Sequence, residues 1–412
     1  MAKNKKGSNF GLKRTILKYL SDLEVVDYRV IISVVFLVMF GLIMIYSASS
    51  AQYGISMVKK QLIVAVGGIA AMLVISYVDY HIYARWAGAI YLFSVLSLFL
   101  VKVPGLGVTK NGASRWIEIA GQSFQPSELM KPAMVILMAY LLTQVGRNLT
   151  FLRADISLFI PGIIAVGLIL VVTKNLSTAL IVLGIIAVMF FVAHPDKKIW
   201  RWVGICLLAV IVLALIYYNT VILKQHEAGD SFRTNRILAW LYPDEYLDVS
   251  MQSRYSLYAI GFGGLLGRGL GSGTMKYYIP EPMNDFIFAV IAEELGLVGC
   301  ALVLFLFIYQ IWRILAVARH ARDLVGGYMA LGIGIHVALQ VILNIGVATS
   351  LLPNTGISLP YISYGGTALL LQLCEMGIVL NISRQIPGRR IRVNGTEQQE
   401  HEETGKHQRK IA

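Results

Sequence analysis

The chain has 412 residues, of which 57% are hydrophobic and only 14% are charged. A soluble globular domain carries about 25% charged residues, so this composition excludes an ordinary soluble enzyme and indicates an integral membrane protein. The formal net charge is +13. The lysines and arginines are scattered over tails and short connectors, where such residues normally set membrane orientation. The sequence has neither a basic stripe nor an aromatic module, so we exclude nucleic acid as a partner.

Apolar runs of about 17 to 25 residues are long enough to cross the hydrocarbon core of a bilayer. Ten such runs predict an all-α polytopic membrane protein. A basic tail (residues 1–29) precedes the ten-span domain (residues 30–384), and a polar tail (residues 385–412) follows it. The spans are expected near residues 30–48, 61–78, 86–103, 128–145, 155–172, 176–193, 199–219, 285–312, 325–349 and 361–383.

The basic residues also predict the orientation of the chain. With a cytoplasmic N-terminus, the inner connectors and the two tails hold most of the lysines and arginines. Both termini are therefore expected inside, as an even number of spans requires. Two longer loops then lie outside, at about residues 104–127 and 220–284. The stretch 256–273 within the second loop is too apolar to lie in water and too rich in glycine to span, which predicts a re-entrant or interfacial element.

Asp285 lies where the second outer loop meets the eighth span. Aspartate is a favoured helix N-cap, so capping alone is one interpretation. The other is a general base, because the helix dipole favours the carboxylate, desolvation disfavours it, and the neighbouring Glu281 raises its pKa further. Glu293 and Glu294 follow in the same apolar run, where acids are costly. At a rise of about 1.5 Å per residue they lie deeper than Asp285, and we assign them a structural role.

The first outer loop brings together Arg115, Glu128 and Lys131 at the start of the fourth span. Glu128 and Lys131 are three residues apart, so on a helix they share a face and can pair. One interpretation is an ion pair at the membrane interface. The other is that Arg115 and Lys131 bind phosphate, which suits a guanidinium and an ammonium group.

A glycine-rich run from Gly261 to Gly273 contains Arg268 and is followed by Lys276. It lacks the spacing of the known nucleotide-binding loops. Flexible backbone beside two cations can still accommodate a pyrophosphate, and a turn in the membrane interface is the alternative.

The ninth span carries a polar stripe of His336, Gln340 and Asn344, which recur every four residues and therefore share one helix face. The tenth span adds Glu375. We favour hydrogen bonding between helices over direct chemistry for these residues. The connector between the two spans, LLPNTGISLPYISYGG, is uncharged and predicts a shaped wall rather than a catalytic group.

Several of these stretches resemble one known family. NGASRWI, QPSELMK, YSLYAIGFGGLLGRGLG, YIPEPMNDFIFAVIAEELG and NIGVATSLLPNTGISLPYISYGGT are similar, in order and spacing, to motifs of the SEDS family of FtsW, RodA and SpoVE, most of all to its FtsW and SpoVE branch. The resemblance runs from the first span to about Arg384. It implies a ten-span peptidoglycan glycosyltransferase of the bacterial plasma membrane that polymerises lipid II into glycan strands during cell division or the control of cell shape.

The resemblance also assigns residues. It implies that Asp285 is the catalytic carboxylate, that Arg115 is the arginine of the family's first motif, and that Glu128 and Lys131 are the acid and the lysine of the second. Its implied partners are lipid II and the growing glycan strand, a class B penicillin-binding protein acting as transpeptidase, other division proteins, and membrane lipids.

The chain departs from the family pattern at two places. Met283 and Asn284 stand where the family has histidine and threonine, and Asn175 stands where it has aspartate. The essential acid is retained, so activity is still expected, whereas a role for position 175 in metal or substrate binding is put in doubt.

The implied reaction needs no cofactor, because the pyrophosphate linkage of the substrate supplies the driving force. The leaving pyrophosphate needs cations, for which Arg115, Lys131, Arg268 and a divalent ion such as Mg²⁺ or Mn²⁺ are the candidates. Two functions of other classes stay open at this point. One is a transporter of lipid II across the membrane, and the other is a division scaffold without enzymatic activity.

Overall fold

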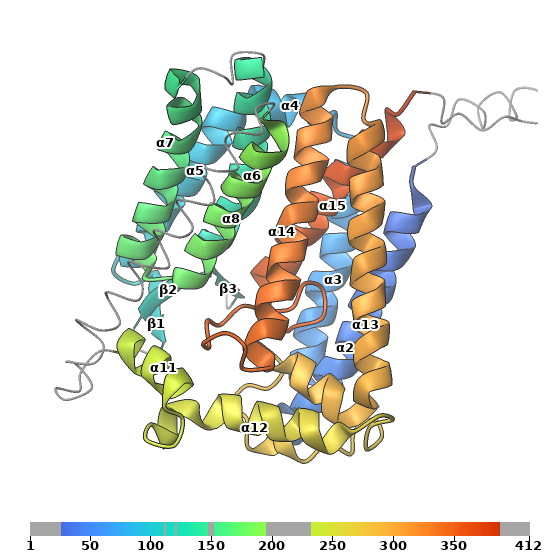
Figure 1. Ribbon diagram of the computed structural model, residues 1–412. Helices are drawn as coiled ribbons and strands as arrows, with labels where there is room; N and C mark the ends of the chain where they lie inside the picture. Colours follow the sequence, from blue (N-terminus) through green and yellow to red (C-terminus); the bar gives the residue numbers. More distant parts are fainter. Residues whose placement is uncertain (1–25, 111–112, 120–121, 147–151, 195–231, 388–412) are drawn as a thin grey trace, which may run out of the picture.

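In the computed structural model of the protein, residues 26–110, 113–119, 122–146, 152–194 and 232–387 are described. Helices make up most of this structure (Figure 1). The longer ones are α2 (Tyr28–Tyr53), α3 (Ser56–Ile75), α5 (Ala87–Phe99), α6 (Pro126–Val145), α7 (Leu152–Leu168), α8 (Leu176–Ala193), α12 (Leu247–Gly263), α13 (Ile287–His320), α14 (Leu324–Ala348) and α15 (Gly366–Arg384). Shorter elements are α4 (Tyr80–Arg85), η1 (Leu100–Lys102), η3 (Ile169–Thr173), α11 (Phe232–Leu241) and η5 (Met275–Tyr277).

Among the described residues, seven helices are long and apolar enough to cross a membrane, namely α2, α3, α6, α8, α13, α14 and α15. Two shorter apolar stretches, Ala87–Lys102 and Leu158–Thr173, coincide with the third and fifth predicted spans. The predicted polytopic, mostly helical membrane fold is therefore confirmed. The seventh predicted span, residues 199–219, lies outside the described residues, so the count of ten stays a prediction.

The loop predicted to be the first outer one contains a small antiparallel sheet, which the all-α prediction did not include. Its strands are β1 (Gly107–Lys110), β2 (Ala113–Ile119) and β3 (Gln122–Phe124), in the order β1-β2-β3. Ile117 pairs with Gly107 on one side and with Phe124 on the other, and its side chain is buried. The sheet leads directly into α6 and carries Arg115 on its central strand.

The sheet, α11, α12 and the start of α13 lie toward one end of the helix bundle, and α2 begins and α15 ends toward the other (Figure 1). Helix α12 lies across its end of the bundle instead of along it. Tyr258 and Phe262 are exposed on α12, and Leu265 and Leu266 are exposed just beyond it. This apolar crossing helix and the turn after it occupy the stretch for which we predicted a re-entrant or interfacial element.

Helix α13 is broken at Gly296, whose φ of 66° and ψ of −165° are not helical. The glycine-rich loop after α12 supplies hydrogen bonds at the break. The amides of Arg268 and Gly269 donate to the carbonyls of Glu293 and Glu294, while the amides of Leu297 and Val298 donate to the carbonyls of Gly264 and Leu265. Irregular backbone at membrane depth is tolerated only where protein or water satisfies it, and here the loop does so.

Candidate active site

Asp285 lies in a tight loop directly before α13. The side-chain amide of Asn284 donates to Glu281 Oε2 at 2.6 Å, and the backbone amide of Asn284 donates to the Glu281 carbonyl at 3.0 Å. The N-cap of α13 is Phe286, and no side chain makes a capping hydrogen bond there. The capping interpretation of Asp285 is therefore wrong, since its carboxylate does not cap the first turn of α13.

The connector of residues 349–365, between α14 and α15, forms a wall against this loop. Asn344 donates from Nδ2 to the carbonyls of Asp285, at 2.8 Å, and Ile357, at 2.6 Å. Ser363 Oγ donates to the Asn284 carbonyl at 2.7 Å. A Cβ added at Gly356 would lie 3.4 Å from Asp285 Oδ2, so the connector backbone runs close beside the carboxylate. The uncharged connector thus acts as the wall that its composition predicted.

Two arginines from separate segments act on Asp285. Arg236 of α11 donates from Nη1 to the Asn354 carbonyl at 3.4 Å, and Arg115 of β2 donates from Nη2 to the Lys174 carbonyl at 2.9 Å. Desolvation by the surrounding protein raises the pKa of Asp285 to about 6, against the opposing charges of Arg236 and Arg115 and with a smaller contribution from Glu281. The site therefore combines a desolvated carboxylate with two guanidinium groups.

Sequence reasoning missed Arg236. Its contact with Asn354 spans 118 positions of the chain, so no local pattern could reveal it. One signal was present: Arg233 and Arg236 lie in a predicted outer loop, where positively charged residues are usually few.

Glu128 and Lys131 form the predicted pair. Lys131 Nζ lies 2.6 Å from Glu128 Oε2, and only 1% of Lys131 is exposed. Nearby, Asn175 accepts from the Thr178 amide at 3.2 Å and so caps α8. The expectation that Lys131 binds phosphate directly finds no support in this geometry, because its ammonium group is buried and already paired. The asparagine that departs from the family pattern serves to start a helix.

Arg268, Lys276, Glu293 and Glu294 form a cluster of their own around the break in α13. Lys276 Nζ lies 2.8 Å from Glu294 Oε1, with both side chains buried. Arg268 Nη1 lies 3.4 Å from Glu293 Oε1. A direct phosphate contact from Lys276 is likewise unsupported, whereas Arg268 is 42% exposed at its side chain. The two glutamates have the structural surroundings that their depth predicted.

The polar stripe of α14 bonds to α15 as expected. His336 Nδ1 lies 2.9 Å from a Glu375 carboxylate oxygen, and Gln372 Nε2 donates to Gln340 Oε1 at 2.8 Å. All four side chains are buried. Asn344, the last member of the stripe, is the one that reaches Asp285.

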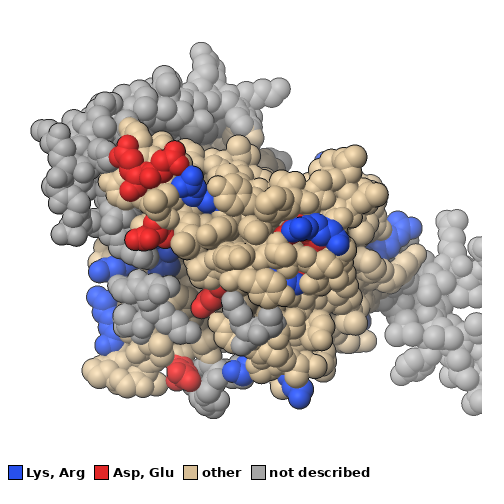
Figure 2. Space-filling view, turned by 90° about the horizontal axis from the view of Figure 1, so that it is seen from below, with Lys and Arg blue, Asp and Glu red and all other residues tan. Residues whose placement is uncertain are grey.

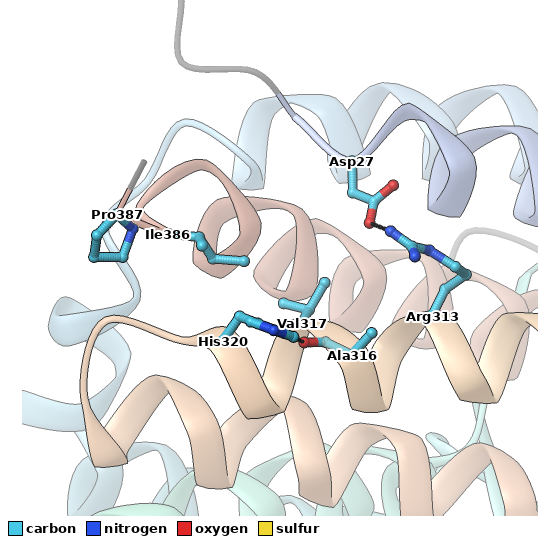
Figure 3. A pocket seen from close by; sticks show the side chains of 7 residues that line it. All are labelled: Asp27, Arg313, Ala316, Val317, His320, Ile386 and Pro387. Atoms are coloured by element: carbon cyan, nitrogen blue, oxygen red, sulfur yellow. Dashed lines mark hydrogen bonds and ion pairs between the residues drawn. The ribbon is translucent and has the colours of Figure 1, made fainter. Parts of the chain in front are cut away.

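A cavity of about 310 Å³ opens elsewhere (Figure 3). Asp27 and Arg313 form an ion pair in its lining, and His320, Ile386 and Pro387 complete one side. It lies at the C-terminal part of α13, whereas Asp285 precedes the N-terminal part of that helix. The cavity is therefore separate from the candidate site.

A divalent cation at the candidate site stays a prediction. The described part of the chain holds no group of three or more His, Cys, Asp or Glu side chains arranged to bind one. At Asp285 two guanidinium groups already supply positive charge, which repels a further cation. Figure 2, which looks onto this end of the bundle, shows acidic and basic side chains in small groups on a largely uncharged surface.

The fold and the site define a polytopic membrane protein with a half-buried, desolvated acid just before a broken helix. Comparison with known proteins identifies the family. The model of the FtsW, RodA and SpoVE family, described as cell cycle proteins, matches residues 28–387, so the chain belongs to this family.

Two similar proteins illustrate the relation. The chain is 38% identical over 369 residues to stage V sporulation protein E of Bacillus subtilis, covering 87% of this chain and 97% of that one. It is 36% identical over 373 residues to a probable peptidoglycan glycosyltransferase FtsW of Geobacter sp. (strain M18), covering 88% and 98%.

Solved structures agree with the fold. A chain of a peptidoglycan synthase complex that coordinates polymerization and crosslinking matches with a TM-score of 0.73 and 26% identity, over 88% of this chain and 99% of that one. The rod shape determining protein RodA of Thermus thermophilus matches with a TM-score of 0.64 and 25% identity, over 88% and 98%.

Proposed function

We propose that this protein is a peptidoglycan glycosyltransferase that polymerises lipid II, with Asp285 as its general base. The observation that carries the proposal is the location of Asp285, a desolvated carboxylate beside Arg236 and Arg115 at the mouth of a membrane helix. Family membership supports the reaction class, since several relatives are named as probable peptidoglycan glycosyltransferases. With a pKa of about 6, Asp285 is ionised at neutral pH and can accept a proton.

In the proposed reaction, the Asp285 carboxylate takes the proton from the 4-hydroxyl group of the acceptor sugar. That oxygen forms a bond to C1 of the lipid-linked donor sugar, and the bond from C1 to the pyrophosphate oxygen breaks. Undecaprenyl pyrophosphate leaves with the bonding electrons, and the configuration at C1 inverts. Arg236 and Arg115 stabilise the negative charge that develops on the leaving pyrophosphate. A positioned base contributes on the order of 10² to 10⁴ in rate.

The setting proposed for this reaction is the outer face of the bacterial plasma membrane, with both termini in the cytoplasm. The similarity to a synthase complex that couples polymerization to crosslinking supports a class B penicillin-binding protein as partner. The description of the family as cell cycle proteins and the stage V sporulation relative support a role in cell division or in sporulation.

The test uses the full-length protein reconstituted with its penicillin-binding partner and given fluorescent lipid II. Glycan strands are resolved on a gel. Asp285→Asn is expected to abolish strand formation while the protein stays monodisperse. Asp248→Asn, the same substitution at an exposed acid of α12, serves as the matched control and is expected to leave strand formation unchanged. Strand formation by Asp285→Asn at the normal rate would overturn the assignment. Movement of lipid II between leaflets without any strands would point instead to a transporter.

A further inference from the structure

The segment from Lys276 to Asp285 is attached at both of its ends to the first part of α13. At one end, Asp285 precedes the helix by two residues. At the other end, Lys276 Nζ pairs with Glu294 Oε1 at 2.8 Å, at the last turn before the break at Gly296. The segment and the half-helix of residues 287–295 therefore close into a ring, in which the ion pair is the bond that can be removed without cutting the chain.

The environment of Lys276 marks it as a structural cation. Only 3% of the residue is exposed. Besides Glu294, its ammonium group donates to Ser47 Oγ of α2 at 3.2 Å and to the Gly271 carbonyl at 2.9 Å. Ser47 Oγ in turn donates to Glu294 Oε1 at 2.6 Å. An ammonium group has three protons to donate, so the three contacts use all of them and leave none for a phosphate.

Glu293 reinforces the same closure from the neighbouring position. Its Oε1 accepts from the backbone amide of Thr274 at 2.7 Å, and its Oε2 accepts from that of Met275 at 3.1 Å. These two residues lead directly into Lys276. Two adjacent side chains of α13 thus hold the incoming loop. Glu293 binds backbone amides of the loop, and Glu294 binds the side chain of Lys276.

Because α13 is broken at Gly296, the contacts of Glu293 and Glu294 with the loop help to fix the position of the half-helix. Because the helical hydrogen bonds between Glu293 and Leu297 and between Glu294 and Val298 are replaced by bonds to the loop, the half-helix is not held rigidly by the rest of α13. Its attachment to the loop and to α2 fixes where it lies. A displacement of about 1 Å at a reacting group can reduce turnover on the order of 10²-fold.

We infer that Lys276, Glu294 and Ser47 form a buried clamp that positions Asp285 for the reaction, and that Lys276 acts as a positioning residue and does not bind substrate. The inference rests on the proposed function, in which Asp285 is the base. It places no substrate contact on the clamp. Its effect is carried to Asp285 by the half-helix on one side and by the loop of residues 277–284 on the other.

The test compares Lys276→Met, Glu294→Gln and the double variant Lys276→Met/Glu294→Gln in the reconstituted complex with fluorescent lipid II. Each single variant is expected to lower kcat on the order of 10²-fold with little change in KM. The double variant is expected to be more active than either single one, because removing one partner of a buried pair leaves an uncompensated charge and removing both does not. Arg254→Gln, which removes the exposed pair with Asp244, is the control and should leave kcat unchanged.

The pH profile separates positioning from simple loss of folded protein. Fewer folded molecules lower the rate equally at every pH. A displaced Asp285 is more hydrated, which lowers its pKa. The acidic limb of the pH profile, where kcat falls as Asp285 becomes protonated, should therefore move to lower pH in the single variants. The charged groups that act on Asp285 are Arg236 of α11, Arg115 of β2 and Glu281 of its own loop, and the connector of residues 349–365 adds none. None of these groups is altered in the variants.

Three results would overturn the inference. One is a raised KM with unchanged kcat in Lys276→Met together with normal kinetics in Glu294→Gln, which would make Lys276 a substrate ligand. The second is a double variant whose loss equals the product of the single losses. The third is lowered rates with an unmoved acidic limb. Failure of the proposed function itself gives a different result, namely strand synthesis by Asp285→Asn.

Discussion

The side-chain amide of Asn344 on α14 holds the backbone carbonyl of Asp285 at 2.8 Å and that of Ile357 at 2.6 Å. One buried amide thus joins the loop that carries the acid to the connector that forms its wall. Asn344 itself is fully buried, so neither carbonyl has an obvious replacement donor in water.

Asn344→Leu is therefore expected to lower both stability and turnover. A buried acceptor left without a donor costs about 1–3 kcal/mol, and two acceptors lose theirs here. The melting temperature in detergent and kcat with lipid II measure the two effects. Ile342→Ala, an exposed position of the same helix, is the control. Equal melting temperatures and rates for Asn344→Leu and the wild type would refute a positioning role for this amide.

The pH at which the rate of strand synthesis falls on the acidic side should depend on the charges around Asp285. The wild-type rate is expected to fall as the pH drops through about 6, because the protonated acid cannot accept a proton. Glu281 raises the pKa of Asp285 and Arg236 lowers it. Glu281→Gln should therefore move the limb to lower pH and Arg236→Gln should move it to higher pH. Rates of strand synthesis between pH 4.5 and 8 measure these shifts, and movement in the same direction would contradict the assignment.

The ionised Asp285 carboxylate should also lower the stability of the fold. A folded-state pKa of about 6 against an ordinary value of 3.8 means that ionisation at neutral pH opposes folding, by at most about 3 kcal/mol. Below pH 3.8 the acid is protonated in both states and the cost is absent. Asp285→Asn should then raise the melting temperature above pH 6, with a gain that shrinks toward pH 4. An inactive variant that is less stable at pH 7.5 would argue against a desolvated carboxylate.

The break in α13 should tolerate no side chain. A Cβ at Gly296 would lie 2.3 Å from the Gly267 amide nitrogen, and the backbone there occupies a region open almost only to glycine. Gly296→Ala is expected to reduce the amount of folded protein recovered from membranes several-fold, since the strain alone costs about 1–3 kcal/mol. Gly261→Ala, where an added Cβ meets nothing within 4 Å, is the matched control. Normal yield and melting temperature for Gly296→Ala would show that the loop can move away.

Local patterns predicted the parts of this protein that local physics determines. The apolar runs predicted the helices, and the three-residue spacing of Glu128 and Lys131 predicted their ion pair. The junction of loop and helix drew attention to Asp285, whose catalytic role stays a prediction. The uncharged connector was correctly predicted to be a wall.

Contacts between distant segments were beyond such reasoning. Arg236 reaches the site through tertiary folding, and Lys276 finds Glu294 and Ser47 only once the loop is folded against α13 and α2. The small sheet was overlooked because a few alternating residues such as Arg115 to Ile119 give a weak signal beside long apolar runs. The suggestion that Lys276 binds pyrophosphate had the same origin, since the sequence does not show that this lysine is paired with Glu294.

The loop that completes α13 at Gly296 also bears on how the protein is made. Residues 263–269 precede α13 in the chain, so a ribosome has already released them when Leu297 and Val298 emerge. The amides and carbonyls at the break can therefore find their partners as the helix enters the bilayer, and they need not wait unbonded in lipid, where each unsatisfied group costs several kcal/mol. Synthesis thus makes the partners of the break available before the break itself is made.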